Sequence, residues 1–561
     1  MKHIFLVLNF AVVLILCVHV RAEPEVQTST RGMVASGHPL ATQAGLNALQ
    51  SGGNAIDAAV AIGLSLGVVD GHNSGIGGGC FLLIRLANGE FAAIDGRERA
   101  PAAATRDMYL RDGEADTSLS QIGSLASGVP GEVAAFDYAV KTYGRKKLSE
   151  LLLPAAKIAE DGFPISRIYA SRLKSTAEEL KKFDASRTVF FPNDRLLLEG
   201  DILRQQDLAT TYRAIAEHGS DWFYRGKFAK ATEAWMTANH GIMTAADFAN
   251  YALEHRIPIQ TRYRGHTIVS FPPPSSGGVH VAQMLNILEP FDLKNCDEAT
   301  RLHLIAEAMK LAFADRAFWL GDPDFVKVPR GLVSTEYAAD LAKKIDREHA
   351  SSVAQHGTPD ASTEDIFHDK HTTHFSVADA EGNWVACTAT VNTGFGSKVI
   401  IPGTGVLLNN QMDDFSVQPG VANFFGLIGA EANAVEPGKR PLSSMSPTIV
   451  LKNGEPIIAV GAAGGPRIIS AVLMELVAML ELGQSPQQAI TAPRIHHQWS
   501  PNELMFESQL PESIQKSLEA RGHNLKPLSS SSTSQIVARS PDGRSFIGAA
   551  DPRGGGSTAG W

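Results

Sequence analysis

The side chains with the clearest chemical potential are two adjacent threonines, Thr372 and Thr373, which have histidines on either side (His371 and His374). A threonine hydroxyl is a weak nucleophile until a base removes its proton. At a chain terminus the α-amine of the same residue can be that base, because its pKa is about 7.7 to 8.0. Thr372 is internal, so this chemistry requires cleavage between His371 and Thr372, and the Thr372 hydroxyl could perform it by attacking the carbonyl of His371.

The residues that follow predict a β-hairpin that would position the threonines. Asp379–Asn383 has the composition of a five-residue turn. If Ala378 pairs with Trp384, the same register places Thr372 opposite Thr390. Alternate residues share one face of a strand, so that face carries a polar set: Thr372, His374, Ser376, Thr388, Thr390 and Asn392. Such a face is typical of a solvated outer surface, and a reactive site is the alternative.

Three further segments combine residue types that could bind or activate a substrate. Gly461–Gly465 (GAAGG) ends a predicted strand, and its small residues expose N–H groups to an anion or an oxyanion. Leu442–Pro447 supplies hydroxyls, and Asn409–Asp414 supplies amides and carboxylates. Each of these patterns is by itself more often a turn or a cap. The glycine segment lacks the G-x-G-x-x-G spacing of dinucleotide sites.

The elements expected to position these residues are layers of helices and sheets. Residues 41–67 predict two alanine-rich helices separated by Ser51–Asn54, and residues 302–317 predict a third helix. Strands are expected at 81–86, 91–95, 375–378, 384–391, 405–410, 448–461 and 533–551. This order predicts an α/β fold in which helices cover sheets. The polar stretch 350–371 predicts an exposed connector.

Composition and the first residues set further limits. The chain has 561 residues, 44% of them hydrophobic, and a net charge of −9, which argues against disorder and against a nucleic-acid partner. Residues 1–22 have the basic start, apolar run and small-residue end of a signal peptide. We therefore expect a mature chain that begins near Glu23 and lies in the periplasm. An uncleaved anchor helix is the alternative.

The cysteines and histidines indicate neither a disulfide framework nor a metal site. Three cysteines remain after residue 22, namely Cys80, Cys296 and Cys387, which is few for an exported protein that depends on disulfides. His496 and His497 are adjacent, and neighbours on a strand point to opposite faces. We therefore expect no metal.

Nine segments together resemble bacterial γ-glutamyltransferases (γ-glutamyl transpeptidases), which are members of the N-terminal-nucleophile hydrolase superfamily. The segments span nearly all of the sequence after the signal peptide. They are GGNAIDAAVA (52–61), GIGGGCFLLIR (75–85), GRERAP (96–101), PPPSSGG (272–278), TTHFSVAD (372–379), LLNNQMDDFS (407–416), KRPLSSMSPTIV (439–450), APRIHHQW (492–499) and DPR (551–553).

The resemblance implies a four-layer αββα sandwich and a precursor that cleaves itself between His371 and Thr372. The products would be a large subunit, residues 23–371, and a small subunit, residues 372–561, which stay together as one composite domain. The implied activity is transfer of the γ-glutamyl group of glutathione and related compounds to water, amino acids or dipeptides, without a metal or organic cofactor. Alternatives are a glutaryl or cephalosporin acylase on the same fold, and a secreted binding protein without catalysis.

The resemblance also implies a role for each site residue. Thr372 would be the nucleophile and Thr390 its hydrogen-bonding partner, and the N–H groups of Gly464 and Gly465 would form the oxyanion hole. Arg97 would bind the α-carboxylate of the donor. The remaining binding residues would be Asp414, Asn392 and Gln411 at the α-amino group, and Ser443 and Ser444 at the carboxylate.

One segment departs from the family pattern. Residues 419–430 resemble the lid loop of some bacterial members, in which a tyrosine closes the donor pocket, but Phe425 occupies that position here. Phenylalanine has no hydroxyl. We therefore expect the lid to close by apolar covering, without a hydrogen bond to Asn392, and the balance to shift from transfer toward hydrolysis.

Overall fold

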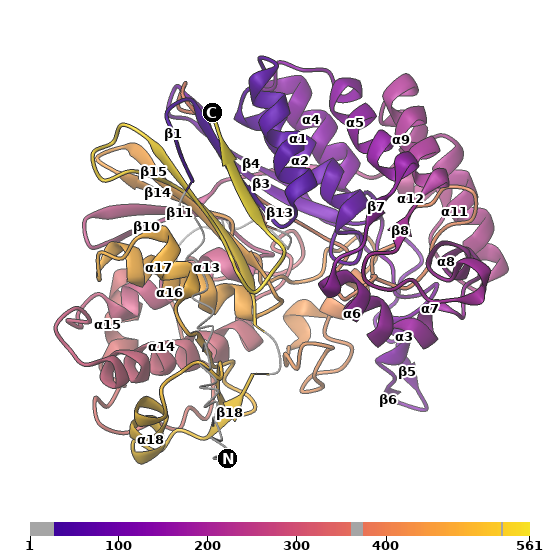
Figure 1. Ribbon diagram of the computed structural model, residues 1–561. Helices are drawn as coiled ribbons and strands as arrows, with labels where there is room; N and C mark the ends of the chain where they lie inside the picture. Colours follow the sequence, from indigo (N-terminus) through magenta and orange to yellow (C-terminus); the bar gives the residue numbers. More distant parts are fainter. Residues whose placement is uncertain (1–26, 361–373, 529–530) are drawn as a thin grey trace, which may run out of the picture.

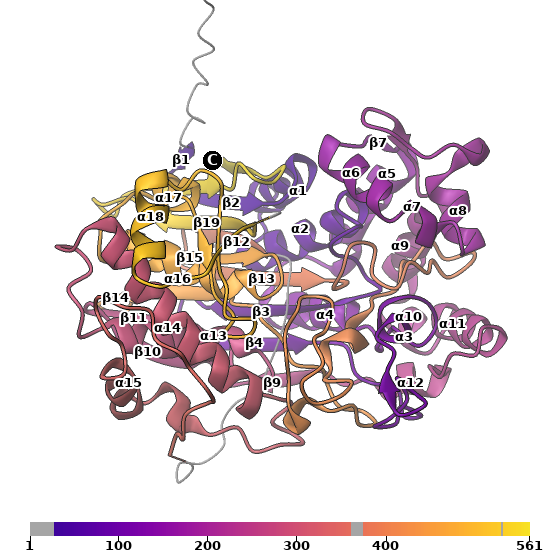
Figure 2. The same cartoon turned by 90° about the horizontal axis from the view of Figure 1, so that it is seen from below.

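Two antiparallel sheets of seven strands each pack face to face, and helices cover both outer faces (Figures 1 and 2). The computed structural model describes residues 27–360, 374–528 and 531–561. The predicted signal peptide and the threonine pair Thr372–Thr373, with His371, lie outside these ranges. The predicted four-layer αββα sandwich is confirmed.

The first sheet has the order β1-β20-β19-β15-β14-β11-β10. Its helical cover is α13 (Ser276–Leu288), α14 (Glu298–Trp319) and α16 (Arg467–Leu480). The strands are β1 Gln27–Ser29, β20 Phe546–Ala550, β19 Thr533–Arg539, β15 Glu455–Ala463, β14 Thr448–Lys452, β11 His266–Ser270 and β10 Ile259–Tyr263.

The second sheet has the order β21-β2-β12-β13-β3-β4-β9. Its cover includes α1 (Pro39–Gln50), α2 (Ala55–Val69), α4 (Glu132–Tyr143), α5 (Leu148–Asp161) and α9 (Gln206–His218). The strands are β21 Ser557–Gly560, β2 Gly32–Ser36, β12 His374–Asp379, β13 Trp384–Thr390, β3 Gly79–Arg85, β4 Phe91–Gly96 and β9 Glu254–Arg256.

An apolar core between the two sheets holds them together. Phe81 of β3 and Phe271, which follows β11, stack with ring centroids 4.5 Å apart. Trp384 of β13 is fully buried in the same cluster. Burial of such large aromatic side chains on both inner faces is a main source of stabilisation in a sandwich of this kind.

The predicted hairpin is confirmed, including its register. Ala378 pairs with Trp384 and, at the far end of the ladder, His374 pairs with Thr388. Asp379 fixes the turn, because its carboxylate accepts the backbone N–H groups of Glu381 and Asn383, both at 3.0 Å.

The interpretation of the polar face of this hairpin as a solvated surface is wrong. Ser376 is fully buried and its hydroxyl lies 3.2 Å from the carbonyl oxygens of Ala459 and Gln535, both on the opposite sheet. His374 lies against Gly461 of β15, where a Cβ would come within 2.3 Å of the imidazole Nδ1. The polar face therefore lies inside the sandwich.

Most of the other predicted elements are confirmed. Asn54 caps α2 in a capping box with Asp57, which explains the break after α1. The strand predicted at 405–410 is wrong, since that stretch has only an isolated bridge between Ile400 and Leu407. Asn409 there donates its side-chain amide to the carbonyls of Gly77 and Gly128, so it ties loops together instead.

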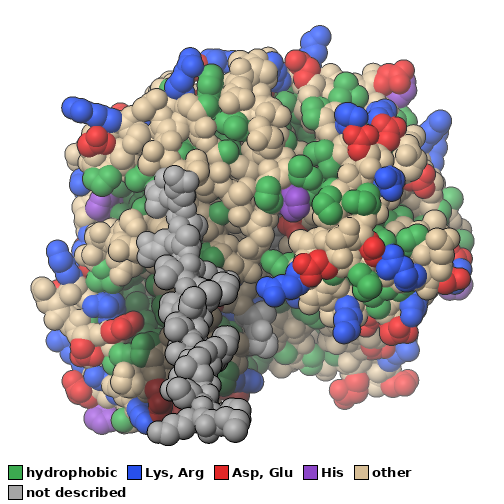
Figure 3. Space-filling view, in the orientation of Figure 1, with side chains coloured by type: hydrophobic (Ala, Val, Ile, Leu, Met, Phe, Trp, Pro, Cys, Tyr) green, Lys and Arg blue, Asp and Glu red, His purple; other side chains and the backbone are tan. Residues whose placement is uncertain are grey.

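On the face seen in Figure 3, Lys and Arg side chains are interspersed with Asp and Glu side chains around the rim. Among the described residues no helix combines the length and the apolar character that crossing a bilayer requires.

Candidate active site

Arg97 lies at the end of β4, directly after Gly96, and its side chain is completely buried. Its Nη2 lies 2.7 Å from Oδ2 of Asp414. Its Nε and Nη1 have no hydrogen-bond partner among the described residues, although Nη1 lies 3.5 Å from a carboxylate oxygen of Glu98. A guanidinium held on one edge by a carboxylate can present its other donors to a second carboxylate.

Charged residues around Asp95 fix the backbone at Arg97. Asp95 Oδ1 accepts the N–H of Arg97 at 3.0 Å. Its Oδ2 accepts hydrogen bonds from Arg256 at 3.1 Å and from Arg440 at 2.9 Å. Asp95, Arg256 and Arg440 are buried and paired with one another, so they hold the backbone at Arg97 in a fixed position.

Asp414 ends a short 3-10 helix, Gln411–Asp414, in which every residue is buried. The amide nitrogen and oxygen of Gln411 have no partner among the described residues. Unpaired polar atoms in a buried position are costly, and they therefore mark places where a ligand is bound or strain is tolerated. The structure places this amide in the same short helix as the Asp414 carboxylate.

The two predicted serines belong to a buried network with α14. Arg316 of α14 donates to Ser444 Oγ at 3.3 Å and to Ser276 Oγ at 2.9 Å. Ser443 Oγ accepts the N–H of Met445 at 3.2 Å. Burial lowers the pKa of Arg316 to about 10, and Asp414 acts in the opposite direction, so the two charges sense each other. The side chain remains a cation at neutral pH.

Thr390 and Asn392 stand together at the end of β13. The backbone N–H of Asn392 donates to Thr390 Oγ1 at 2.7 Å. Asn392 has a positive φ of 79°, which asparagine tolerates better than most residues. Its side-chain amide donates to the carbonyl of Asn410 at 3.0 Å, which joins this pair to the helix that carries Asp414.

The glycine loop between β15 and α16 has a backbone that only glycine adopts readily. Gly464 has φ +142° and Gly465 has φ +60°. A Cβ at Gly464 would come within 2.8 Å of the Ser532 backbone, and one at Gly465 within 2.6 Å of the Phe425 ring. The N–H groups of both glycines donate no hydrogen bond to the described residues, so they are suited to an oxyanion.

The loop that carries Phe425 is fixed over these glycines by backbone hydrogen bonds. The Phe424 N–H donates to Asp413 Oδ2 at 3.0 Å. Gln498 donates its side-chain amide to the carbonyl of Gly426 at 2.9 Å. The Phe425 ring contacts Gly465, while the Asn392 amide is occupied by Asn410. The loop that carries Phe425, the glycine loop and the helix Gln411–Asp414 are thus connected.

His374, the first residue of β12, is a structural histidine. Its Nε2 lies 2.8 Å from Ser376 Oγ and its Nδ1 lies 3.3 Å from Thr388 Oγ1. Complete burial lowers the pKa of His374 to about 3, so the ring is neutral at physiological pH. It therefore supports the strand that follows the threonine pair without contributing a charge.

A comparison with protein families agrees with this arrangement. The family described as gamma-glutamyltranspeptidase matches residues 41–561. The chain belongs to this family. The match covers every strand of the two sheets except β1 and β2, and every described candidate residue, from Arg97 to the glycine loop.

Gamma-glutamyltranspeptidases and acylases are both among the similar proteins. The glutathione hydrolase proenzyme of Escherichia coli (strain K12) is 45% identical over 93% of this chain and 90% of its own length. The acylase ACY 1 proenzyme of Pseudomonas sp. (strain SE83) is 39% identical over 90% of this chain and 88% of its own length. The crystal structure of cephalosporin acylase from Bacillus halodurans superposes with a TM-score of 0.86 at 31% identity, and the match covers 96% of this chain and 97% of that one.

Several residues of this gamma-glutamyltranspeptidase site were not found from the sequence. Each of them lies on a helix or in a loop where the sequence pattern predicts only core or turn residues: Arg316, Asn410, Asp413 and Gln498. An arginine within the apolar pattern of α14 was a usable signal, since buried arginines are rare unless paired. Asn410 and Asp413 lie in the segment Asn409–Asp414 and Gln498 lies in the segment 492–499, both of which the sequence marked, but neither pattern assigned a role to these three residues.

Proposed function

We propose that the protein is an exported, self-cleaving γ-glutamyltransferase and glutathione hydrolase. The observation that carries this is the buried contact between Arg97 and Asp414, which lie 2.7 Å apart, with Gln411 in the same short helix as Asp414. Its two charges complement the carboxylate and the ammonium of one amino-acid head group. A γ-glutamyl donor has such a head group at the end away from its reactive amide.

The reaction begins after cleavage has made Thr372 a new N-terminus. Its α-amine takes the hydroxyl proton as Oγ attacks the γ-amide carbonyl, and the N–H groups of Gly464 and Gly465 stabilise the resulting oxyanion. The carbon–nitrogen bond then breaks and the proton leaves with the amine, which is cysteinylglycine when the donor is glutathione. Water or an acceptor amine next displaces Thr372 Oγ from the γ-glutamyl ester. Two such half-reactions predict ping-pong kinetics.

Acylase activity is a second candidate because an acylase is among the similar proteins. A glutaryl group lacks the α-amine, so it would lose the charge-assisted hydrogen bond that the ammonium of a γ-glutamyl group would form with the Asp414 carboxylate. We therefore expect γ-glutamyl-p-nitroanilide to be hydrolysed about ten- to a hundredfold faster than glutaryl-p-nitroanilide, measured as kcat/KM. Equal rates would favour the acylase.

The predicted cleavage can be tested on a denaturing gel and by intact mass. The wild-type protein should give two chains, residues 23–371 and 372–561, and Thr372→Ala should give one uncut chain. Thr390→Ala provides a comparison, because it removes only the predicted partner of the nucleophile and should slow cleavage. An uncut wild-type chain would contradict self-cleavage, and an uncut wild-type chain that also shows no anilide turnover would favour the binding-protein alternative.

Export is supported by the sequence pattern of residues 1–22. Expression in a bacterium with two membranes should place the mature protein in the periplasm, with Glu23 at its N-terminus. Fractionation by osmotic shock followed by N-terminal sequencing tests this. A chain that keeps its first residues and sediments with membranes would instead favour an anchor helix.

A further inference from the structure

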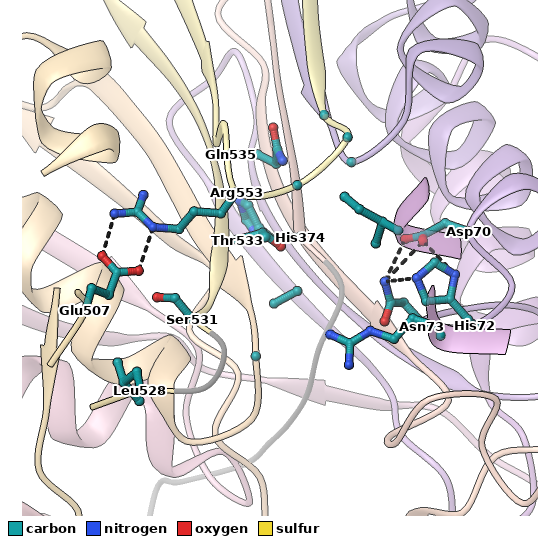
Figure 4. Close-up of a pocket in the computed structure, with 18 of the residues that line it drawn as sticks. Asp70, His72, Asn73, His374, Glu507, Leu528, Ser531, Thr533, Gln535 and Arg553 are labelled. Atoms are coloured by element: carbon teal, nitrogen blue, oxygen red, sulfur yellow. Dashed lines mark hydrogen bonds and ion pairs between the residues drawn. The ribbon is translucent and has the colours of Figure 1, made fainter. Parts of the chain in front are cut away.

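Arg316 on α14 differs from the other buried arginines because no carboxylate among the described residues forms an ion pair with it. Each of the others lies 3.8 Å or less from a carboxylate oxygen, namely Arg85, Arg97, Arg256, Arg440 and Arg494. The partly buried Arg553 is held in the same way, by Glu507 at 2.7 and 2.6 Å (Figure 4). Arg316 donates instead to the hydroxyls of Ser276 and Ser444.

The contact with Arg316 determines the direction in which Ser444 donates its proton. A guanidinium can only donate hydrogen bonds, whereas a hydroxyl donates one and also accepts. In the contact of 3.3 Å, Ser444 Oγ is therefore the acceptor, and its O–H proton points away from Arg316. In this orientation the hydroxyl can donate to the α-carboxylate that the proposed donor carries.

The second serine ties Arg316 to the backbone beside Ser444. Arg316 Nε donates to Ser276 Oγ at 2.9 Å, and the N–H of Ser276 donates to the carbonyl of Ser443 at 2.8 Å. The Ser276 hydroxyl donates to the same carbonyl. Gly277 lies so close to the carbonyl of Met445 that a Cβ would not fit. The predicted carboxylate-binding serines are therefore fixed relative to α13 and α14.

The charges around Arg316 are suited to one further anion. Burial lowers the pKa of Arg316 to about 10, and the charge of Asp414 opposes this effect. Asp414 is itself bonded to Arg97 at 2.7 Å. A buried cation without a paired anion is costly. A carboxylate bound between Arg97 and Ser444 would supply negative charge near both guanidinium groups.

We propose that Arg316 is a positioning residue that makes the donor site select a free α-carboxylate. It acts by orienting the Ser444 hydroxyl and by placing a buried positive charge behind it. The inference rests on the proposed function. A donor whose α-carboxylate is replaced by an amide keeps the reactive γ-amide but offers neither the negative charge nor a second carboxylate oxygen.

The test compares two donors that differ only at this carboxylate. γ-Glutamyl-p-nitroanilide and its α-amide are hydrolysed without an acceptor, and the ratio of their kcat/KM values is measured. Arg316→Gln should lower this ratio about three- to tenfold, the range for one hydrogen bond. Arg301→Gln is the matched control and should leave the ratio unchanged. Arg301 lies on α14 about 22 Å along the axis from Arg316, and it donates to the carbonyls of Leu293 and Cys296.

The amount of folded enzyme cancels in the ratio, and looser packing around Arg316 would slow both donors alike. Structural damage therefore does not imitate the expected result, and an unchanged ratio in Arg316→Gln would overturn the proposal. Arg316→Lys keeps the charge without the planar fork, so it should lower the ratio by a smaller factor. If Arg316→Gln is not cleaved, an unchanged ratio in Arg316→Lys overturns the proposal instead. A wild type that turns over neither donor would refute the proposed function, and this inference with it.

Discussion

Arg97 illustrates how one side chain can serve two carboxylates. Its planar fork is fixed by Asp414 at 2.7 Å, and two more donors lack partners among the described residues. A lysine at this position has one point charge and cannot bond in two directions at fixed geometry. The proposed donor site therefore requires the planar, oriented guanidinium group of an arginine, and a positive charge alone is not enough.

Replacing Arg97 with lysine should therefore weaken donor binding. We expect Arg97→Lys to raise KM for γ-glutamyl-p-nitroanilide about 30- to 100-fold, which corresponds to about 2 to 3 kcal/mol. Steady-state hydrolysis without acceptor measures it. Arg111→Lys is the control, because Arg111 is an exposed arginine paired with Asp116. A KM within twofold of the wild-type value would contradict the role of Arg97.

Asp413 should make stability depend on pH. Burial raises its pKa from 3.8 to about 6, and Asp414 adds to the rise. The folded state therefore binds this proton more tightly than the unfolded state, so the contribution of Asp413 to stability is complete below about pH 4 and is lost as pH rises through about 6. The loss is about 2 to 3 kcal/mol.

Asp413→Asn removes this titration while keeping an acceptor for the Phe424 N–H. The thermal midpoint of the variant minus that of the wild type should be larger at about pH 7 than at about pH 4. Other titrating groups are present in both proteins and cancel in the difference. The same difference at both pH values would show that the Asp413 carboxyl is not responsible.

At the scale of elements, the loop that carries Phe425 is the segment that we expect to act as a lid over the donor site. Phe425 covers Gly465 with an apolar ring, and the loop backbone is tied to Asp413 and Gln498. Because a ring without a hydroxyl forms no hydrogen bond to the donor site, we expect water to reach the γ-glutamyl ester more easily.

Phe425→Tyr should raise the ratio of transfer to hydrolysis about two- to tenfold, the effect of roughly one net hydrogen bond. Product analysis with γ-glutamyl-p-nitroanilide and glycylglycine measures the ratio. The matched control is Phe424→Tyr, since the neighbouring ring is 56% exposed and its new hydroxyl would point to solvent. If both variants keep the wild-type ratio, the residue at position 425 does not control the access of water.

Elements with a strong local pattern were predictable. The capped alanine-rich helices and the β12–β13 hairpin follow from spacing that is set within a few residues of the chain. Residues 405–410 are apolar enough to predict a strand, but Asn409 and Asn410 take hydrogen-bond partners from distant loops. Tertiary partners of this kind are not visible in a local pattern.

At the scale of the whole molecule, each sheet combines strands from both sides of the predicted cut. Strand β2 lies between β21 and β12, and β14 lies between β11 and β15. The chain before residue 372 contributes β2 and β11, and the chain after it contributes the others. Separating the two subunits would therefore break ladders inside both sheets and open the core between them.

We predict that the cleaved protein stays associated and unfolds as one unit. The two chains should co-elute on gel filtration in native buffer. Their unfolding in urea, followed by tryptophan fluorescence and by far-ultraviolet circular dichroism, should show coincident midpoints. Separate elution of the chains in native buffer, or two transitions far apart, would contradict an interleaved core.

The sequence by itself determined the residue types, the hairpin register and, through its motifs, the family and the layered fold. It could not decide whether the polar face of His374 and Ser376 looks toward solvent or inward, because alternation along a strand is the same in both cases. The first sheet decides this, because its strands β15 and β19 bury that face of β12. Only the tertiary structure brings Arg97 to Asp414 across 317 positions, because such a contact depends on packing between distant segments.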